Sequence, residues 1–251
     1  MSALHTVRRR ADVMGTVASI HVHDDPSLVD PRLVDDAIDA VLAELERLEA
    51  MFSTFRPTSE ISRVNRGELD LVDCSPEVID VVDACTWLEH ASGGAFDIRA
   101  RGRLDPAGFV KGWAAERASR LLVEHGLEHW YLGVGGDIVV HGRPAGRDCW
   151  TIAIADPTKR SAVITGITVT GGAVATSGTA ERGGHLWDAS GVDADTWASV
   201  TVIGPSLTWA DAFATTACAM GPGGLDWVSQ FDEYQAFAVT HQGTLVNTRA
   251  A

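Results

Sequence analysis

The sequence places a carboxylate and a hydroxyl four residues apart near its C-terminal end, within LTWADAFATT at residues 207–216. This segment follows a Gly-Pro-Ser break and has the composition of a helix, so Asp211 and Thr215 are expected to share one helical face. Hard oxygen ligands suit Mg²⁺, which keeps several waters and is completed by substrate phosphates. The pair therefore predicts a magnesium site for a phosphate-bearing substrate.

The same two residues have an interpretation that needs no metal. Ser206 can cap the helix, and Asp211 can then lie near its positively polarised start. Thr215 can bond back to a carbonyl one turn earlier. The segment alone leaves both interpretations open.

A glycine-rich turn could bring backbone close to a nucleotide. Gly135, Gly136 and Asp137 join two expected strands. Glycine permits positive φ and close approach, and the carboxylate after it can accept from a ribose or an amide. The GxGxxG spacing is absent and a strand follows, which excludes a Rossmann fingerprint. A plain hairpin turn explains the same residues.

Two further sites carry candidate chemistry. Gly112 costs about 1 kcal/mol relative to Ala inside the helix expected at residues 108–125, which indicates a packing or backbone demand. Beside it, the Lys111 ammonium can meet an anion, or its stem can lie along apolar surface with the amine in water.

His185 and Asp188 lie three apart in a glycine-flanked segment. They could form a general base with its carboxylate partner, or a surface pair without a role.

Composition limits the class of protein. The chain has 251 residues, of which 45% are hydrophobic and 22% charged, as in ordinary globular proteins. A net charge of −14 argues against nucleic-acid binding, because phosphate backbones require clustered Lys and Arg. The four cysteines form no CxxC pair and are expected to be reduced thiols. No apolar run has the length of a membrane span and no apolar leader core is present, so a cytoplasmic protein is expected.

Hydrophobic spacing and turn residues predict a mixture of helices and strands. No repeat or linker interrupts the chain, so residues 1–251 are interpreted as one α+β unit with mixed sheets and packed helices, in a bilobed arrangement. Arg8 to Arg10 are expected to form a solvated arm. The helices are expected at residues 33–51, 75–90, 108–125, around Asp211 and at 225–231, and the strands at 13–23, 130–134, 138–141, 150–155, 163–169, 173–176, 200–203, 236–239 and 244–247.

Eight motifs follow one another along the chain: MGT (14–16), FSTFRP with SEIS and Asn65 (52–65), GGAFD (93–97), Asp105 through KGWA and Arg117-Ala118 (105–118), GGD (135–137), ATSG (175–178), HLWD (185–188) and ADAFAT (210–215). In this order they resemble the ApbE family, the FAD:protein FMN transferases. The resemblance covers nearly the whole chain and implies an ApbE-like (T-fold-like) α+β fold.

The resemblance also implies an activity, namely Mg²⁺-dependent transfer of FMN from FAD to a Thr or Ser hydroxyl of a target flavoprotein, with release of AMP. Such phosphoryl transfer depends on positioning and charge neutralisation. The implied metal ligands are Asp211, Thr215 and the backbone carbonyl of Val110. His185, with Asp188, is implied as the catalytic group that accepts the proton of the target hydroxyl.

The remaining implied contacts divide between the two halves of FAD. Met14 and Phe55 are expected beside the flavin ring. Polar contacts to the nucleotide and its phosphates are expected from Lys111, Glu116, Gly135, Gly136, Asp137, Thr176, Ser177 and Gly178.

The chain departs from the family pattern at three places. Val110 replaces an alanine, Ala189 replaces the proline of the HxxDP element, and only seven residues lie between Asp97 and Asp105, where the family has a longer segment. These departures keep two alternatives open: an FAD-binding module that does not transfer, and an FAD pyrophosphate hydrolase that gives FMN and AMP.

Overall fold

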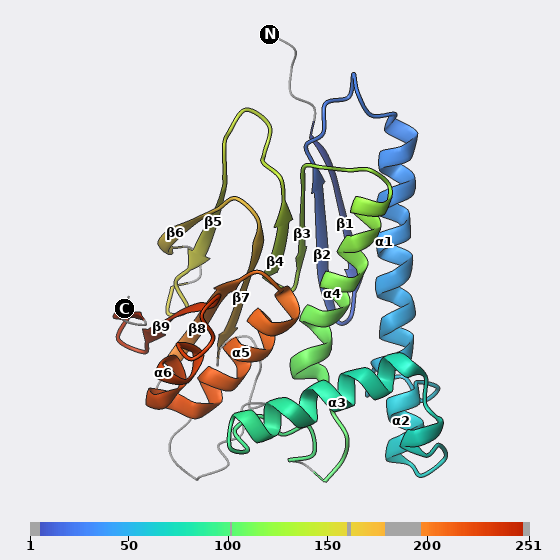
Figure 1. Cartoon of the computed structure of the whole chain (residues 1–251), viewed down its shortest axis with the longest axis vertical. Coiled ribbons are helices and arrows are strands. Elements are labelled where there is room, and N and C mark those ends of the chain that lie inside the picture. Colours follow the sequence, from blue (N-terminus) through green and yellow to red (C-terminus); the bar gives the residue numbers. More distant parts are fainter. Residues whose placement is uncertain (1–5, 101, 160–161, 179–196, 248–251) are drawn as a thin grey trace.

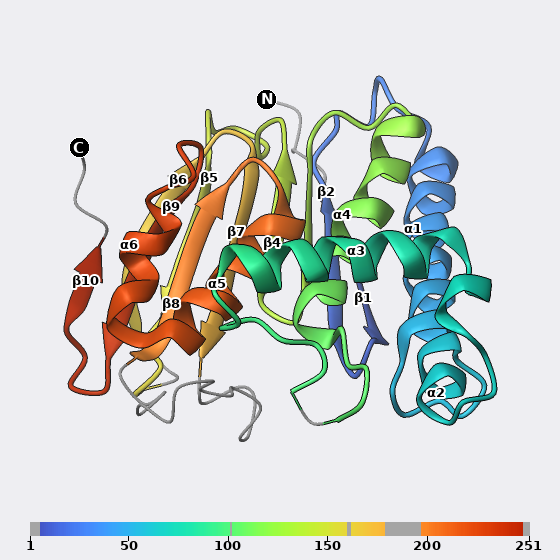
Figure 2. The same cartoon turned by 60° about the horizontal axis from the view of Figure 1, so that its bottom comes forward.

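One antiparallel sheet organises the molecule, with helices packed on one face and a two-stranded hairpin on the other (Figures 1 and 2). The structure is a computed structural model that describes residues 6–100, 102–159, 162–178 and 197–247. The architecture is mixed α+β, as the sequence predicts.

The strands of the large sheet follow the order β1-β2-β3-β4-β7-β8-β9-β10, with every neighbouring pair antiparallel. Strands β5 and β6 pair separately. Their bounds are β1 Val7–Val13, β2 Thr16–Val22, β3 Trp130–Val134, β4 Asp137–His141, β5 Trp150–Ala155, β6 Val163–Val169, β7 Gly172–Gly178, β8 Trp197–Gly204, β9 Gln235–Thr240 and β10 Leu245–Asn247.

The α-helices lie on one face of the sheet, and α3 runs below α4 and α5 in Figure 1 and in front of α4 in Figure 2. Short 3₁₀ turns at Leu71–Asp73 and Gly221–Gly223 join some of them. The helices are α1 Pro31–Phe52, α2 Glu60–Asn65, α3 Pro76–Ala91, α4 Ala107–Glu124, α5 Leu207–Met220 and α6 Gly224–Val228.

Alternating residues along the central strands feed two separate hydrophobic cores. In β4, Val139 packs into the large core beneath the helices, whereas Val140 faces the β5–β6 hairpin. In β7, Ala173 likewise packs into the large core and Val174 into the core beneath the hairpin. Since successive strand residues point to opposite faces, the sheet is buried on both sides in this region.

Local signals set the starts of the major helices. Asp30 caps α1 through a side-chain bond from the N–H of Arg32, with Pro31 in the first turn. Ser206 caps α5 by accepting from the N–H of Trp209. Both arrangements satisfy N–H groups that lack a partner within the helix. The expected cap at Ser206 is therefore present.

The N-terminal prediction found β2 but missed β1. The segment expected as one strand at residues 13–23 contains β2, which is the second strand of a hairpin that begins with β1 and turns at Met14 and Gly15, both with positive φ (55° and 69°). Arg8 to Arg10 form part of the edge strand β1 instead of an arm, with exposed side chains. Charged side chains are common on edge strands because they oppose pairing with other chains. An exposed edge strand with three arginines therefore has the same composition as a solvated arm.

The segment expected as a loop at residues 52–67 contains the short helix α2. Ser59 caps this helix through a bond from the N–H of Ser62. None of the helices in the described part of the chain combines the length and the apolar character needed to cross a membrane.

Candidate functional site

Helices α4 and α5 approach closely where α4 carries glycine. A Cβ added to Gly112 would lie 2.7 Å from the Cβ of Asp211 and 2.7 Å from the carbonyl oxygen of Leu207. A Cβ added to Gly108 would lie 3.4 Å from the Cγ2 of Thr215. Asp211 and Thr215 therefore both face α4, on one side of α5. The demand that the sequence indicated at Gly112 is the close approach of another helix.

The contact between Gly112 and α5 leaves no room for a side chain at position 112. We expect Gly112→Ala to lower the free energy of unfolding by about 1–3 kcal/mol, because the new methyl group overlaps atoms of α5. The intrinsic helix preference of Ala, worth about 1 kcal/mol, acts in the opposite direction and is outweighed. Urea unfolding measures the change. Gly223→Ala is the matched control, since nothing lies within 4 Å of its added Cβ and its φ is negative. Equal or higher stability of Gly112→Ala would contradict the packing.

A lysine and two buried carboxylates from distant parts of the chain form the centre of the site. The Lys111 ammonium forms an ion pair with Asp137 and lies 3.4 Å from Oδ1 of Asp211. The side chains of Asp137 and Asp211 are 1% and 0% exposed, and that of Lys111 is 18% exposed. We call these three residues the carboxylate cluster. Buried carboxylates need a cation or hydrogen bonds, and the lysine supplies the positive charge.

Backbone N–H groups complete the bonding of both carboxylates. The N–H of Gly112 donates to Oδ2 of Asp211 at 3.0 Å, and the N–H of Thr176 donates to Oδ1 of Asp137 at 2.9 Å. The missing side chain of Gly112 is what lets its N–H face the carboxylate of the other helix. The cluster thus joins α4, α5, β4 and β7.

Hydroxyl groups extend the site along β7. The hydroxyls of Ser177 and Thr215 are 2.9 Å apart and share a hydrogen bond. Those of Thr176 and Thr201 are also 2.9 Å apart. The alternative prediction for Thr215, a bond to a carbonyl one turn earlier, is not what the structure shows; the neighbouring Thr216 makes that bond to Ala212. Carboxylate and hydroxyl oxygens therefore gather where α5 meets β7.

The glycine-rich turn lies beside this cluster. Gly135 and Gly136 have positive φ (60° and 96°) and connect β3 to β4, the hairpin expected from the sequence. A Cβ added to Gly135 would lie 3.0 Å from Oγ1 of Thr16 and 3.5 Å from Cδ of Lys111. The turn thus fits between the β1–β2 hairpin and the carboxylate cluster.

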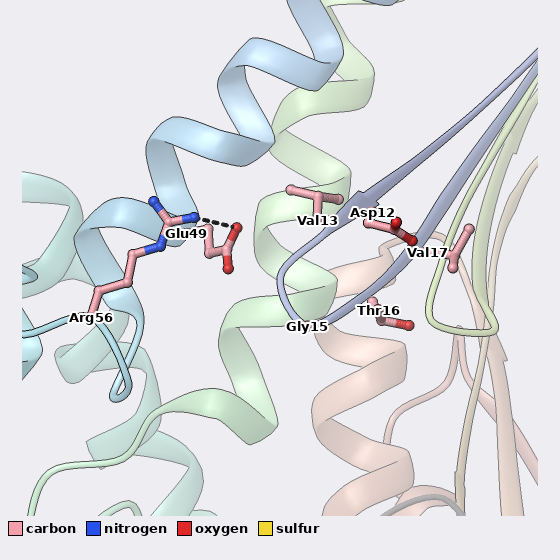
Figure 3. Close-up of a pocket in the computed structure, with 7 residues that line it drawn as sticks. All are labelled: Asp12, Val13, Gly15, Thr16, Val17, Glu49 and Arg56. Carbon is pink, nitrogen blue, oxygen red and sulfur yellow. Dashed lines mark ion pairs between the residues drawn. The ribbon is translucent and has the colours of Figure 1, made fainter.

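Thr16 also lines a pocket of about 500 Å³ (Figure 3). The tip of the β1–β2 hairpin lines it on one side, and Glu49 and Arg56 approach it from the end of α1 and the segment beyond. Glu49 and Arg56 form an ion pair at 2.9 Å. The pocket therefore lies between the two segments that contain Met14 and Phe55.

The other predicted residues have different surroundings. Phe55 is 90% exposed, and Met14 occupies the hairpin turn. The Glu116 carboxylate bonds to the start of α5, so its predicted contact with a nucleotide stays a prediction. The side chain of Val110 is buried in the large core. Gly178 ends β7.

His185 and Asp188 lie outside the described residues. Their predicted roles as proton acceptor and partner stay predictions.

Sequence reasoning missed several neighbours of the site. Thr201 pairs with Thr176 across β7 and β8, and no local motif marks it. Asp12, Glu49 and Arg56 line the pocket from separate segments. Arg56 lies within the FSTFRP motif and Thr16 within the MGT motif. These two motifs were the only features of the sequence that could have indicated residues lining the pocket.

The donor atoms fit a hard cation. Among the described residues, no group of three or more His, Cys, Asp or Glu side chains is arranged to hold a metal. A cation at Asp211 and Thr215 would consequently need oxygens from the backbone and from substrate, which is the ligand set that Mg²⁺ commonly takes.

The class of protein follows from the fold. The structure resembles the crystal structure of the ApbE protein from Thermotoga maritima with a TM-score of 0.83, at 23% identity, covering 98% of this chain and 97% of that one. The molecule is an α+β protein with the ApbE-type fold. The sequence model of the ApbE family matches residues 14–102 and 99–238. The chain therefore belongs to the ApbE family.

Curated relatives carry one name. A protein named FAD:protein FMN transferase from Klebsiella pneumoniae (strain 342) is 30% identical over 123 residues, which are 45% of this chain and 35% of that protein. The protein of the same name from Escherichia coli (strain K12) is 28% identical over 149 residues, 55% of this chain and 42% of that protein. The chain thus spans less than half the length of these two relatives.

Proposed function

We propose that this protein transfers FMN from FAD to a Thr or Ser hydroxyl of an acceptor flavoprotein, with Mg²⁺ bound by Asp211, Thr215 and the backbone carbonyl of Val110. The observation that carries the proposal is that Asp211 and Thr215 face α4 together, beside Lys111 and Asp137. The names of the curated relatives support the substrate and the reaction.

The reaction exchanges the phosphoanhydride bond of FAD for a phosphoester bond to the acceptor. The acceptor oxygen forms a bond to the FMN phosphorus, and the bond from that phosphorus to the bridging oxygen breaks. AMP leaves with the bridging oxygen, and the proton of the acceptor hydroxyl is taken up, by His185 in this proposal. When bound, Mg²⁺ neutralises charge on the diphosphate and on the departing AMP.

The residues of the chain divide the remaining work. Lys111 offers a fixed positive charge near the diphosphate while holding Asp211 and Asp137 in place. Gly135 and Gly136 let backbone approach the nucleotide, and Thr176, Ser177 and Gly178 present hydroxyl and backbone groups along β7. The pocket between the β1–β2 hairpin and Arg56 is proposed to take the flavin ring, next to Met14 and Phe55.

The proposal is tested with purified flavoproteins from the same organism as acceptors. Each is incubated with the protein, FAD and Mg²⁺, and products are followed by intact-protein mass spectrometry and by chromatography of the nucleotides. We expect an FMN adduct on a Thr or Ser together with equimolar AMP. FMN and AMP without an adduct would indicate hydrolysis, and bound but unconverted FAD would indicate a module that only binds. Either result contradicts the proposal. A cytoplasmic location of the protein, expected from the sequence, is part of this proposal.

A further inference from the structure

Glu116 joins the middle of α4 to the first turn of α5. One of its carboxylate oxygens, Oε2, accepts hydrogen bonds from Oγ of Ser206 at 2.6 Å, from N of Thr208 at 2.8 Å and from Oγ1 of Thr208 at 2.7 Å. The bond from Thr208 satisfies an N–H that has no partner within its own helix. The negative charge also lies at the positive end of the α5 dipole, where it is favourable.

The bonds of Glu116 continue a regular pattern between the two helices. Positions 108, 112 and 116 of α4 are four residues apart and share one face. Their partners run in the opposite order along α5: Thr215, Asp211 and then residues 206–208. The two glycines let the helices approach closely. Of the three positions, only 116 has a side chain that bonds across the interface.

The position of α5 along α4 determines the proposed metal site. Asp211 and Thr215 belong to α5, whereas Val110 and the Gly112 N–H belong to α4. A slip by one residue would move the α5 ligands by about 1.5 Å along the helix axis. Mg²⁺ demands near-ideal octahedral geometry at about 2.0–2.1 Å, so it cannot follow such a shift.

We propose that Glu116 is a positioning residue that fixes α5 against α4 and so sets the geometry of the Mg²⁺ ligands, without touching FAD. This inference rests on the proposed function for the metal. It replaces the direct nucleotide contact that the resemblance implies for Glu116.

The neighbouring polar groups are consistent with this role. Burial raises the pKa of Tyr234 to about 12, and a hydrogen bond with Ser206 opposes that rise. The phenol is neutral at neutral pH, as an unperturbed tyrosine is, and adds no second negative charge beside the Glu116 carboxylate.

The test compares Glu116→Ala with Glu116→Gln in the full chain. Mn²⁺ serves as the probe for the metal site, and its binding is followed by the electron paramagnetic resonance of the free ion. FAD binding is measured separately by flavin fluorescence in EDTA. We expect Glu116→Ala to weaken Mn²⁺ binding by about 10–100-fold, the usual effect of losing a group that orients a ligand. FAD affinity in EDTA should stay within about twofold. Glu116→Gln should restore most of the Mn²⁺ affinity, because its amide oxygen can still accept hydrogen bonds from the start of α5.

Hydrogen exchange of the backbone amides measures how firmly α5 is held in place, without any metal present. Glu116→Ala should raise the exchange of the amides in α5, and Glu116→Gln should leave it close to wild type. Ser59→Ala is the control for general destabilisation, because it removes the side-chain cap of α2 and none of the hydrogen bonds of Glu116. It should change neither Mn²⁺ binding nor exchange in α5.

Two results would overturn the role of Glu116. One is unchanged Mn²⁺ affinity in Glu116→Ala, and the other is a loss of FAD affinity in EDTA in both Glu116 variants, which would indicate direct contact. The Asp211→Ala variant distinguishes an error in the proposed metal site from an error in the role of Glu116. If this variant binds Mn²⁺ as tightly as wild type, the proposed metal site is wrong, and the inference about Glu116 is wrong with it. If Glu116→Ala does not fold, Thr208→Val removes one of the three bonds and should weaken Mn²⁺ binding about threefold. An unchanged affinity in that variant would also overturn the inference.

Discussion

We expect Asp211→Ala to lower the rate of FMN transfer by roughly 10²–10³-fold. Asp211 is the one carboxylate of the proposed metal site, and it is held from two directions by the Gly112 N–H and the Lys111 ammonium. Charge stabilisation by a bound metal is worth several kcal/mol, and each 1.36 kcal/mol corresponds to a factor of ten in rate. Initial rates of adduct formation at saturating FAD and Mg²⁺ measure the effect.

The control for this variant is another carboxylate on a helix. Asp80 lies in α3 and is exposed, so Asp80→Ala should transfer at the wild-type rate. Urea unfolding of Asp211→Ala is needed alongside, because loss of the bond to Gly112 also removes a contact between α4 and α5. A folded Asp211→Ala protein with a transfer rate within about threefold of wild type would remove the metal assignment.

The second large effect is expected at Lys111. Lys111→Met keeps the packing of the stem but removes the positive charge between Asp137 and Asp211, both of which are buried. Removing one partner of a buried ion pair costs about 3–5 kcal/mol, because the remaining charge has no compensation. We therefore expect the free energy of unfolding to fall by about that amount in the absence of divalent cations. Addition of Mg²⁺ should restore part of it, since a cation at Asp211 supplies new positive charge and binds only the folded protein.

Lys159→Met is the matched control, because Lys159 is exposed and surface substitutions usually change stability by less than about 0.5 kcal/mol. A stability of Lys111→Met equal to that of wild type would show that the two carboxylates do not depend on this lysine. Recovery by Na⁺ at equal ionic strength would instead attribute the effect of Mg²⁺ to screening.

Local patterns in the sequence predicted the helices and much of the sheet. Pro31 and the Ser75-Pro76 pair marked helix starts, and the expected helix at residues 108–125 corresponds to Ala107–Glu124. The spacing of Asp211 and Thr215 predicted a shared face because helical periodicity is a local property. The turn at Gly135 and Gly136 could be predicted for the same reason.

Contacts between distant segments could not be predicted from such patterns. Lys111 and Asp211 are 100 residues apart in sequence, so the residues alone left open whether the ammonium would meet an anion or water. The bonds of Glu116 span 90 residues or more, and only the packing of α4 on α5 reveals them. The edge strand β1 was missed because three consecutive arginines give no alternation of polar and apolar residues.

The most direct test of the account is a crystal structure of the protein with FAD and Mn²⁺, in which anomalous scattering locates the metal. We predict a peak roughly 2.0–2.3 Å from a carboxylate oxygen of Asp211 and from Oγ1 of Thr215, with the FAD diphosphate completing its ligands. A metal bound to the diphosphate but away from both side chains, or FAD bound away from the carboxylate cluster, would contradict it.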